Sequence, residues 1–279
     1  MNTQLERAHR FRALHERGAF VIPNCWDGGS ARLLQSLGFP ALATSSAATA
    51  ATYGRQDGQI TRDEALANAR LICEASPLPV SADLENGFGL TPADTARTIE
   101  LAADTGLVGG SIEDTTGDAA NPIFDFSLAV DRVASAAAAA RALDFPFTLT
   151  ARAENFLHGR PDLEDTIRRL QAFEKAGADV LYAPALPSLD AIRSVCASVM
   201  KPVNVLAGAR QTHSVAELAE AGAKRISLGS GLNRAALGGF LQAARELKDS
   251  GTVGFLREAA PYADIQALMP EPGGEGTHS

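Results

Sequence analysis

Acidic side chains stand at the ends of short apolar runs in this sequence. Asp83 and Glu85 end one run, Glu113 ends the next, and Arg152 lies near the end of the one after that. Because side chains alternate between the two faces of a strand, Asp83 and Glu85 point to the same side. Three carboxylates in one space repel one another unless a cation neutralises them. All-oxygen ligands favour Mg²⁺, with Mn²⁺ as an alternative, and Mg²⁺ takes only one or two carboxylates directly.

Each of these acids has an ordinary explanation when it is taken alone. An acid at a strand end can cap the next helix, or it can form an ion pair with Arg152. The combination of Asp83, Glu85, Glu113 and Arg152 favours a metal site over these explanations. His158 is the only histidine near the predicted site, and a loop role and a catalytic role both stay open for it.

The positions of the lysines argue against one class of enzyme, the Schiff-base aldolases. A Schiff-base aldolase needs a lysine at the carboxyl end of a strand, and no lysine of this sequence is predicted there. The sequence contains four: Lys175, Lys201, Lys224 and Lys248.

Elements that could position such a site alternate along the chain. Apolar, β-branched runs alternate with longer helical patterns, which indicates βα units and a parallel sheet. The predicted strands are 19–24, 41–46, 79–85, 109–114, 147–153, 179–184, 202–207 and 225–230. Eight strands close a parallel barrel, with the active site at their carboxyl ends. We therefore predict an α/β fold, a (β/α)8 TIM barrel.

Capping signals support the helices between these strands. Helix starts are predicted at Thr61, Thr91, Asp162, Ser188 and Ser214. Glycines that end helices directly before strands are Gly38, Gly106, Gly177 and Gly222. Residues 1–17 are predicted to form an N-terminal amphipathic helix, 1–260 a single domain, and 261–279 a C-terminal helical extension whose last ten residues are disordered.

Composition narrows the range of partners. The chain has 279 residues, a net charge of −8 and a pI of about 5.2. An acidic chain without a basic tract argues against nucleic acid and anionic membranes as partners. The three cysteines show no metal-site or disulfide spacing, and neither a signal peptide nor a membrane span is recognisable. These features predict a cytoplasmic protein.

These residues together resemble the isocitrate lyase/phosphoenolpyruvate mutase superfamily, from about Pro23 to about Phe240. The motifs that carry the resemblance are Asn24-Cys25-Trp26-Asp27, Ser45-Ser46-Ala47, Gly54 to Asp57, Asp83 to Gly89, Ser111-Ile112-Glu113-Asp114 and Ala151-Arg152-Ala153-Glu154. Each motif alone is weak, and their order and spacing make the signal specific.

The resemblance implies a role for each matching residue. Asp83 would bind Mg²⁺, while Glu85 and Glu113 would hold its waters. Arg152 would pair with the anionic end of the substrate, and Asp57 would lie close to the reacting carbon. The remaining substrate-binding residues implied by the resemblance are Ser45, Ser46, Ala47 and Asn204.

One loop departs from the family pattern. Isocitrate and methylisocitrate lyases carry a Lys/Arg-Cys-Gly-His loop after the fourth strand, and its cysteine is the catalytic acid. Here the stretch from Thr115 to Pro122 contains no Cys, His or Lys. Those two activities are therefore disfavoured. Glu85 also stands where many members have Asp, which a water-mediated ligand tolerates.

Three hypotheses follow. The first is a Mg²⁺-dependent lyase or decarboxylase that acts on a small 2-oxo dicarboxylate such as oxaloacetate through a stabilised enolate. The second is P–C bond chemistry on phosphonopyruvate or phosphoenolpyruvate, as a mutase or a hydrolase. The third is a protein that binds 2-oxo acids with little catalysis. The resemblance also implies a homo-oligomer, a dimer or a tetramer.

Overall fold

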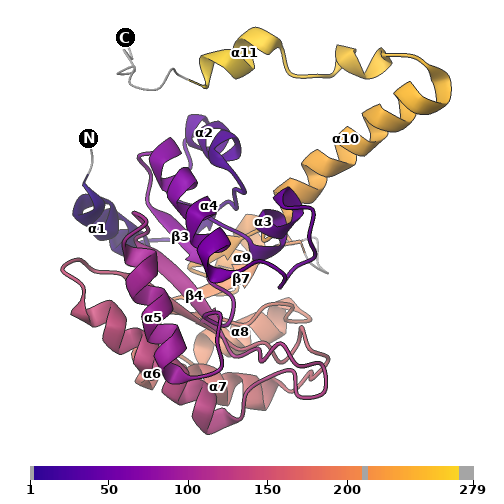
Figure 1. The fold of residues 1–279 in the computed structure, drawn as a ribbon. Helices are drawn as coiled ribbons and strands as arrows, with labels where there is room; N and C mark the ends of the chain where they lie inside the picture. Colours follow the sequence, from indigo (N-terminus) through magenta and orange to yellow (C-terminus); the bar gives the residue numbers. More distant parts are fainter. Residues whose placement is uncertain (1–2, 209–212, 270–279) are drawn as a thin grey trace.

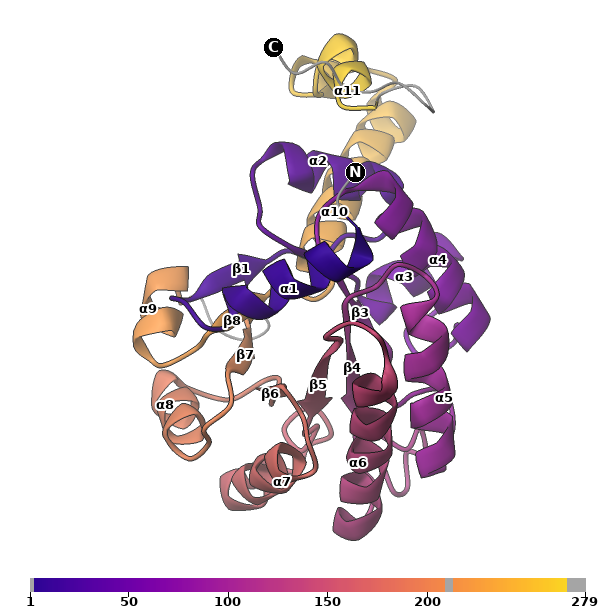
Figure 2. The same cartoon turned by 90° about the vertical axis from the view of Figure 1, so that its left-hand side faces the viewer.

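Eight short parallel strands surround a central axis, and helices follow them along the chain (Figures 1 and 2). This computed structural model describes residues 3–208 and 213–269. The strands are β1 (Phe20–Ile22), β2 (Leu42–Ala43), β3 (Val80–Asp83), β4 (Gly109–Glu113), β5 (Thr148–Arg152), β6 (Val180–Tyr182), β7 (Val203–Leu206) and β8 (Arg225–Ser227). Each predicted run contains one of them, so the TIM-barrel prediction is confirmed.

The sheet runs in the order β1-β8-β7-β6-β5-β4-β3-β2, so its two ends are β1 and β2. A parallel bridge between Asn24 and Ala43 brings these ends together. The amide of Cys25 donates to the carbonyl of Ala43 at 2.8 Å, and the amide of Ala43 donates to Pro23 at 2.9 Å. These bonds bring the carboxyl ends of all eight strands to one face of the barrel.

The helices begin where the sequence signals lie. They are α1 (Gln4–Leu14), α2 (Gly28–Ser36), α3 (Ser46–Thr52), α4 (Arg62–Ala75), α5 (Pro92–Ala103), α6 (Phe126–Ala142), α7 (Leu163–Lys175), α8 (Leu189–Ala197), α9 (Val215–Glu220), α10 (Gly231–Ser250), η1 (Gly254–Arg257) and α11 (Tyr262–Ala267). Thr61, Thr91 and Ser214 each complete a capping box, and Asp162 and Ser188 cap α7 and α8. The predicted helix-ending glycines all have positive φ and follow the C-cap residue by one or two positions, which confirms that the helices end at them.

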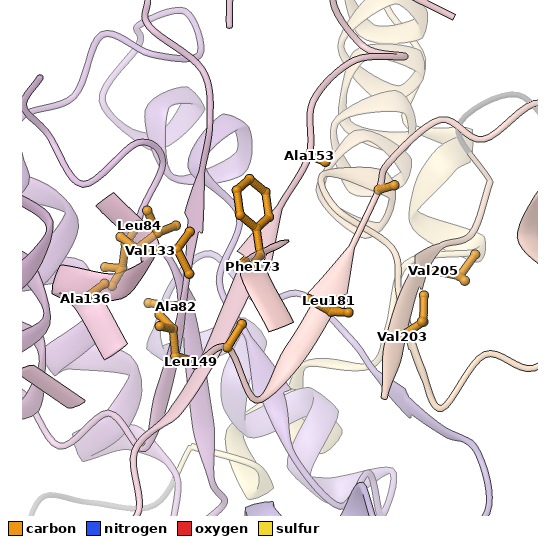
Figure 3. Close-up of a cluster of buried hydrophobic side chains, with 14 of the residues drawn as sticks. Ala82, Leu84, Val133, Ala136, Leu149, Ala153, Phe173, Leu181, Val203 and Val205 are labelled. Atoms are coloured by element: carbon orange, nitrogen blue, oxygen red, sulfur yellow. The ribbon is translucent and has the colours of Figure 1, made fainter. Parts of the chain in front are cut away.

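The largest apolar cluster lies between the strands and the surrounding helices. Figure 3 shows part of it: Leu84, at the end of β3, lies together with Val133 and Ala136 of α6. Phe173 of α7 and Leu181 of β6 belong to the same cluster and are completely buried. This packing fixes the strands from outside, so the barrel interior is free to carry polar side chains.

Helix α1 lies across the amino ends of the strands (Figure 2). Its Phe11 is fully buried with Ala8, Ile22 and Val108 in a second apolar cluster. A Cβ on Gly109 would come within 2.9 Å of the Phe11 ring, so glycine is needed there for the ring to enter. The amino end of the barrel is therefore sealed by packing.

Helix α10 leads away from the barrel instead of lying along it (Figure 1). It exposes the large apolar side chains of Leu237, Phe240, Leu241 and Leu247. Across the described residues, no helix is both long and apolar enough to span a membrane. The last ten residues, for which disorder is predicted, lie outside the described part of the chain.

Candidate metal and substrate site

Arg152 is the centre of an ionic cluster at the carboxyl ends of β3, β4 and β5. Its Nη1 lies 3.0 Å from Asp83 Oδ1, its Nη2 lies 3.0 Å from Glu113 Oε2, and its Nε donates to Glu154 Oε1 at 2.7 Å. The strand register places Glu113 and Tyr182 on either side of Arg152, and the guanidinium lies 5.1 Å from the Tyr182 ring centre. Burial acts to lower the pKa of Arg152, but the three carboxylates hold it well above its usual value.

The acids of this cluster carry more negative charge than one guanidinium neutralises. Burial raises the pKa of Glu113 well above its usual range, against the pull of Arg152. Burial, followed by the charges of Asp83 and Asp57, raises the pKa of Glu85 to about 7. A bound cation would relieve this repulsion, since it favours the ionised form of every acid around it.

The arrangement fits a magnesium ion that binds largely through water. Among the described residues, no three acidic, histidine or cysteine side chains are arranged to ligate one ion directly. Mg²⁺ characteristically takes one or two carboxylates and keeps several waters. Glu85 Oε1 is buried and has no hydrogen-bond partner, which suits a carboxylate that receives a metal-bound water. The chemistry of these oxygen donors therefore fits Mg²⁺.

The backbone after β3 adopts an uncommon conformation. Glu85 has a φ of 48° and Phe88 a φ of 56°, and both residues are left-handed without being glycine. Such conformations cost energy and concentrate at functional sites. Arg132 of α6 helps to hold this turn, because its guanidinium donates to the carbonyls of Thr91 and Asn86.

A cavity of about 780 Å³ opens above the cluster. We call it the mouth cavity. Asp57, Glu85, Glu113 and Arg152 line it together, as does Ser46. Of the predicted site residues, these five thus share one space.

The turn at Ser45 adjoins Asp83. Ser45 caps α3, and its Oγ accepts from the amide of Ala48 at 3.4 Å. The amide of Ser46 donates to Asp83 Oδ2 at 3.1 Å. The turn of Ser45, Ser46 and Ala47 is therefore joined directly to the predicted metal ligand.

Asn204 lies deeper in the barrel. Its Oδ1 accepts from Arg225 Nε at 2.8 Å, and its Nδ2 donates to Ser227 Oγ at 3.0 Å. It borders an inner cavity of about 60 Å³, which Asp83 and Arg152 also line from above. Asn204 thus lies beneath the cluster and does not line the mouth cavity.

Two buried acids of the site, Asp114 and Glu154, belong to the motifs quoted from the sequence but were given no role there. Glu154 is 2% exposed and holds Arg152 Nε. Asp114 accepts from the amide of Glu154 at 2.8 Å and pairs with Arg169 at 3.0 Å, while burial raises its pKa to about 6. The sequence could have indicated the position of Glu154, because residues two apart on a strand share a face and Glu154 follows Arg152 by two.

The geometry agrees with comparisons with known proteins. The family model described as phosphoenolpyruvate phosphomutase matches residues 11–248. The chain belongs to this family. It is therefore a member of the isocitrate lyase/phosphoenolpyruvate mutase superfamily, whose members are enzymes, and the resemblance is confirmed.

Relatives within this superfamily carry different activities. A solved structure from Burkholderia cenocepacia, described as a candidate lyase or mutase, has a TM-score of 0.94 and 54% identity over 96% of this chain and 97% of that one. A 2-methylisocitrate lyase of Shewanella oneidensis is 33% identical, covering 87% of this chain and 85% of its own. An oxaloacetate decarboxylase of Bradyrhizobium diazoefficiens is 29% identical, covering 92% and 90%.

Proposed function

We propose that this protein is a Mg²⁺-dependent carbon–carbon lyase, decarboxylase-like, that acts on a small 2-oxo dicarboxylate of the oxaloacetate type. The observation that carries the proposal is the acidic cluster around Arg152, in which Asp83, Glu85 and Glu113 exceed the positive charge available. An oxaloacetate decarboxylase among the relatives supports the same substrate class.

The metal, when bound, supplies a Lewis acid that stabilises negative charge on the 2-oxo carboxylate. Arg152 binds the anionic end of the substrate. In this structure its Nη groups are held by Asp83 and Glu113, and they become available once those carboxylates are neutralised in another way. The turn from Ser45 to Ala47 supplies hydroxyl and amide donors to the substrate carboxylate.

Decarboxylation mainly requires that the protein stabilise the negative charge of the enolate with groups held in fixed positions. Loss of CO₂ next to a 2-oxo group leaves an enolate, whose charge must be stabilised where it develops. Asp57, which lines the mouth cavity together with Glu85, would lie near the reacting carbon. The loop from Thr115 to Pro122 lacks the cysteine of the methylisocitrate lyases, and decarboxylation does not require that cysteine.

The experiment is a product analysis. Purified protein with Mg²⁺ is offered oxaloacetate, 3-methyl-oxaloacetate, 2-methylisocitrate and phosphonopyruvate, and released CO₂, glyoxylate and phosphate are quantified. CO₂ from an oxaloacetate, dependent on Mg²⁺ and lost with a chelator, is expected. If the protein turns over neither oxaloacetate nor 3-methyl-oxaloacetate, the proposal is wrong. Tight binding of oxalate without turnover of any of them would then favour a binding protein.

A second candidate is P–C chemistry on phosphonopyruvate or phosphoenolpyruvate. The family model itself is described as a phosphoenolpyruvate phosphomutase, which favours it. The same panel decides between the two: released phosphate or interconversion of the two phosphorus compounds identifies this activity, and CO₂ identifies the first.

We further propose that the chain forms a homo-oligomer, a dimer or a tetramer. The exposed apolar side chains of α10, on a helix that leaves its own barrel, support this (Figure 1). Light scattering at several concentrations tests the proposal, and a monomer throughout would contradict it.

A further inference from the structure

His158 lines the mouth cavity next to the loop from Thr115 to Pro122, the loop that lacks the cysteine of the lyases. It lies after β5, and its Nε2 is 3.0 Å from Thr115 Oγ1 on the loop after β4. Both residues line the mouth cavity together with Glu113. The amide of His158 donates to the carbonyl of Glu154 at 3.1 Å. The imidazole is thus held from two sides, by its ring and by its backbone.

Thr115 itself is fixed by a small hairpin. It forms an antiparallel bridge with Ile123, and the amide of Thr116 donates to the carbonyl of Pro122 at 3.0 Å. The stretch where the lyases carry a catalytic cysteine is here a hydrogen-bonded turn, and its first hydroxyl, on Thr115, contacts the imidazole of His158. Nδ1 of His158 has no hydrogen-bond partner among the described residues.

The other ionisable groups of the cavity are poor proton donors once a cation is bound. Those that line it with His158 are Asp57, Arg62, Asp63, Glu85, Glu113, Arg152 and Glu154. A neighbouring cation ionises the carboxylates, so that they accept and do not donate. The two arginines keep their protons at any working pH. The imidazole of His158 can carry a proton on a ring nitrogen and release it to a ligand in the cavity, as a general acid does.

We propose that His158 delivers the proton to the enolate carbon, and that Thr115 is a positioning residue which aims the ring. This inference rests on the proposed function. In the step, the C3–C4 bond of the 2-oxo dicarboxylate breaks and CO₂ leaves, while the electron pair becomes that of the enolate. C3 then takes a proton from the imidazolium, which becomes neutral imidazole and recovers a proton from water.

The location of His158 on one wall has a stereochemical consequence. A proton from a fixed donor reaches C3 from one face only, whereas a proton from bulk water reaches an accessible enolate from either face. With 3-methyl-oxaloacetate in D₂O, the enzyme should therefore form 2-oxobutanoate deuterated at C3 in a single configuration. The configuration can be read after enzymatic reduction to 2-hydroxybutanoate.

The variants His158→Asn and Thr115→Val test the two roles. We expect H158N to lose turnover by about 100-fold or more and to give both configurations. We expect T115V to lose less in kcat and to give a mixture, and Thr115→Ser to restore one configuration. His9→Asn, at an exposed position of α1, is the control. Mg²⁺ binding by calorimetry should be unchanged in H158N. Retention of rate and configuration in H158N would overturn the inference.

A second measurement does not depend on turnover. Oxalate is a planar dianion that mimics the enolate of pyruvate. When oxalate and Mg²⁺ are added together, the ¹⁵N resonance of Nδ1, assigned by its loss in H158N, should shift as it donates to the ligand. An unshifted resonance in an oxalate-saturated protein would overturn the role of His158 even if decarboxylation is observed. A shifted resonance in a protein that decarboxylates no substrate would instead count against the proposed function and leave His158 as the ligand's donor.

Discussion

At the amino end of the barrel, α1 seals the strands with buried aromatic rings, whereas at the carboxyl end acids crowd around Arg152. His15 belongs to the sealed end, edge-on to the rings of Phe11 and Phe20 at 4.9 and 5.1 Å. Its Nδ1 donates to the carbonyl of Phe11 at 2.9 Å. Desolvation, followed by the charge of Arg225, lowers the pKa of His15 to about 3, so it is buried as a neutral ring.

The difference shows how one fold separates stability from reactivity. The amino end gains stability by burying apolar surface and keeping its titratable group uncharged. The carboxyl end gathers like charges that repel one another, and this unfavourable arrangement supports the proposal that the site binds a cation. Changes at the two ends should therefore have different consequences.

The largest effect is expected from Asp83→Ala at the carboxyl end. This variant should lose metal-dependent turnover by about 1,000-fold or more, because it removes the direct metal ligand and the partner of the Ser46 amide. The fold should be retained, since the change also removes one of the repelling charges. The measurements are kcat/KM with Mg²⁺ and circular dichroism. Asp190→Ala, on the exposed start of α8, is the control, and full activity in D83A would contradict the metal assignment.

Phe11→Ala at the amino end should give the converse result. Removing a fully buried ring should lower the free energy of unfolding by about 3–5 kcal/mol through lost burial and the cavity left behind. Mg²⁺ affinity, measured by calorimetry below the melting temperature, should stay unchanged. Leu5→Ala on the same helix is the control, because Leu5 is 47% exposed. A weakened Mg²⁺ affinity in F11A would show that the two ends are coupled.

The smallest effect concerns pH, and its sign differs between the ends. In metal-free protein the pKa of Glu85 is raised from 4.5 to about 7, so the folded state binds the proton more tightly than the unfolded state. Its contribution to stability is present below pH 4.5 and is lost as pH rises through 7. His15, lowered from 6.5 to about 3, contributes above pH 6.5 and loses that contribution as pH falls.

Urea titrations from pH 4 to 8 on the wild type and two variants separate these effects. Relative to the wild type, Glu85→Gln should reduce the loss of stability on the alkaline side, and His15→Leu should reduce the loss on the acidic side. Saturating Mg²⁺ should abolish the Glu85 effect and leave the His15 effect in place. If E85Q and the wild type have parallel profiles without metal, the repulsion in the cluster is weaker than the geometry indicates.

The sequence predicted the eight strands because each is a β-branched run between capped helices, as with Thr61 before α4. It also placed Asp83, Glu85, Glu113 and Arg152 at one face, since the carboxyl ends of parallel strands meet there. Strand lengths were overestimated where a cap intervenes: the run at 41–46 contributes only two strand residues, because Ser45 already caps α3.

Contacts between distant segments could not be predicted in this way. The bond from His158 to Thr115 joins two loops 43 positions apart, and neither loop contains a pattern that indicates the other. The deep position of Asn204 depends on Arg225, a buried guanidinium bonded to neutral partners, Asn204 and Thr150. Local alternation gives the face of a strand on which a side chain lies, while its depth in the barrel depends on the stagger of the strands.

The left-handed backbone at Glu85 restricts which amino acids this position can accept. Asn, Asp and Gly enter that region of conformational space with little penalty, and β-branched residues do not. In a library of all substitutions at position 85, the variants would therefore differ in the energy of the left-handed backbone as well as in the charge of the side chain. Glycine is compatible with the turn but has no carboxylate. Aspartate is compatible with the turn and has a carboxylate on a shorter side chain. Valine strains the turn and has no carboxylate. If Glu85 contacts the metal as proposed, few single substitutions at this position can change the metal preference without also straining the backbone.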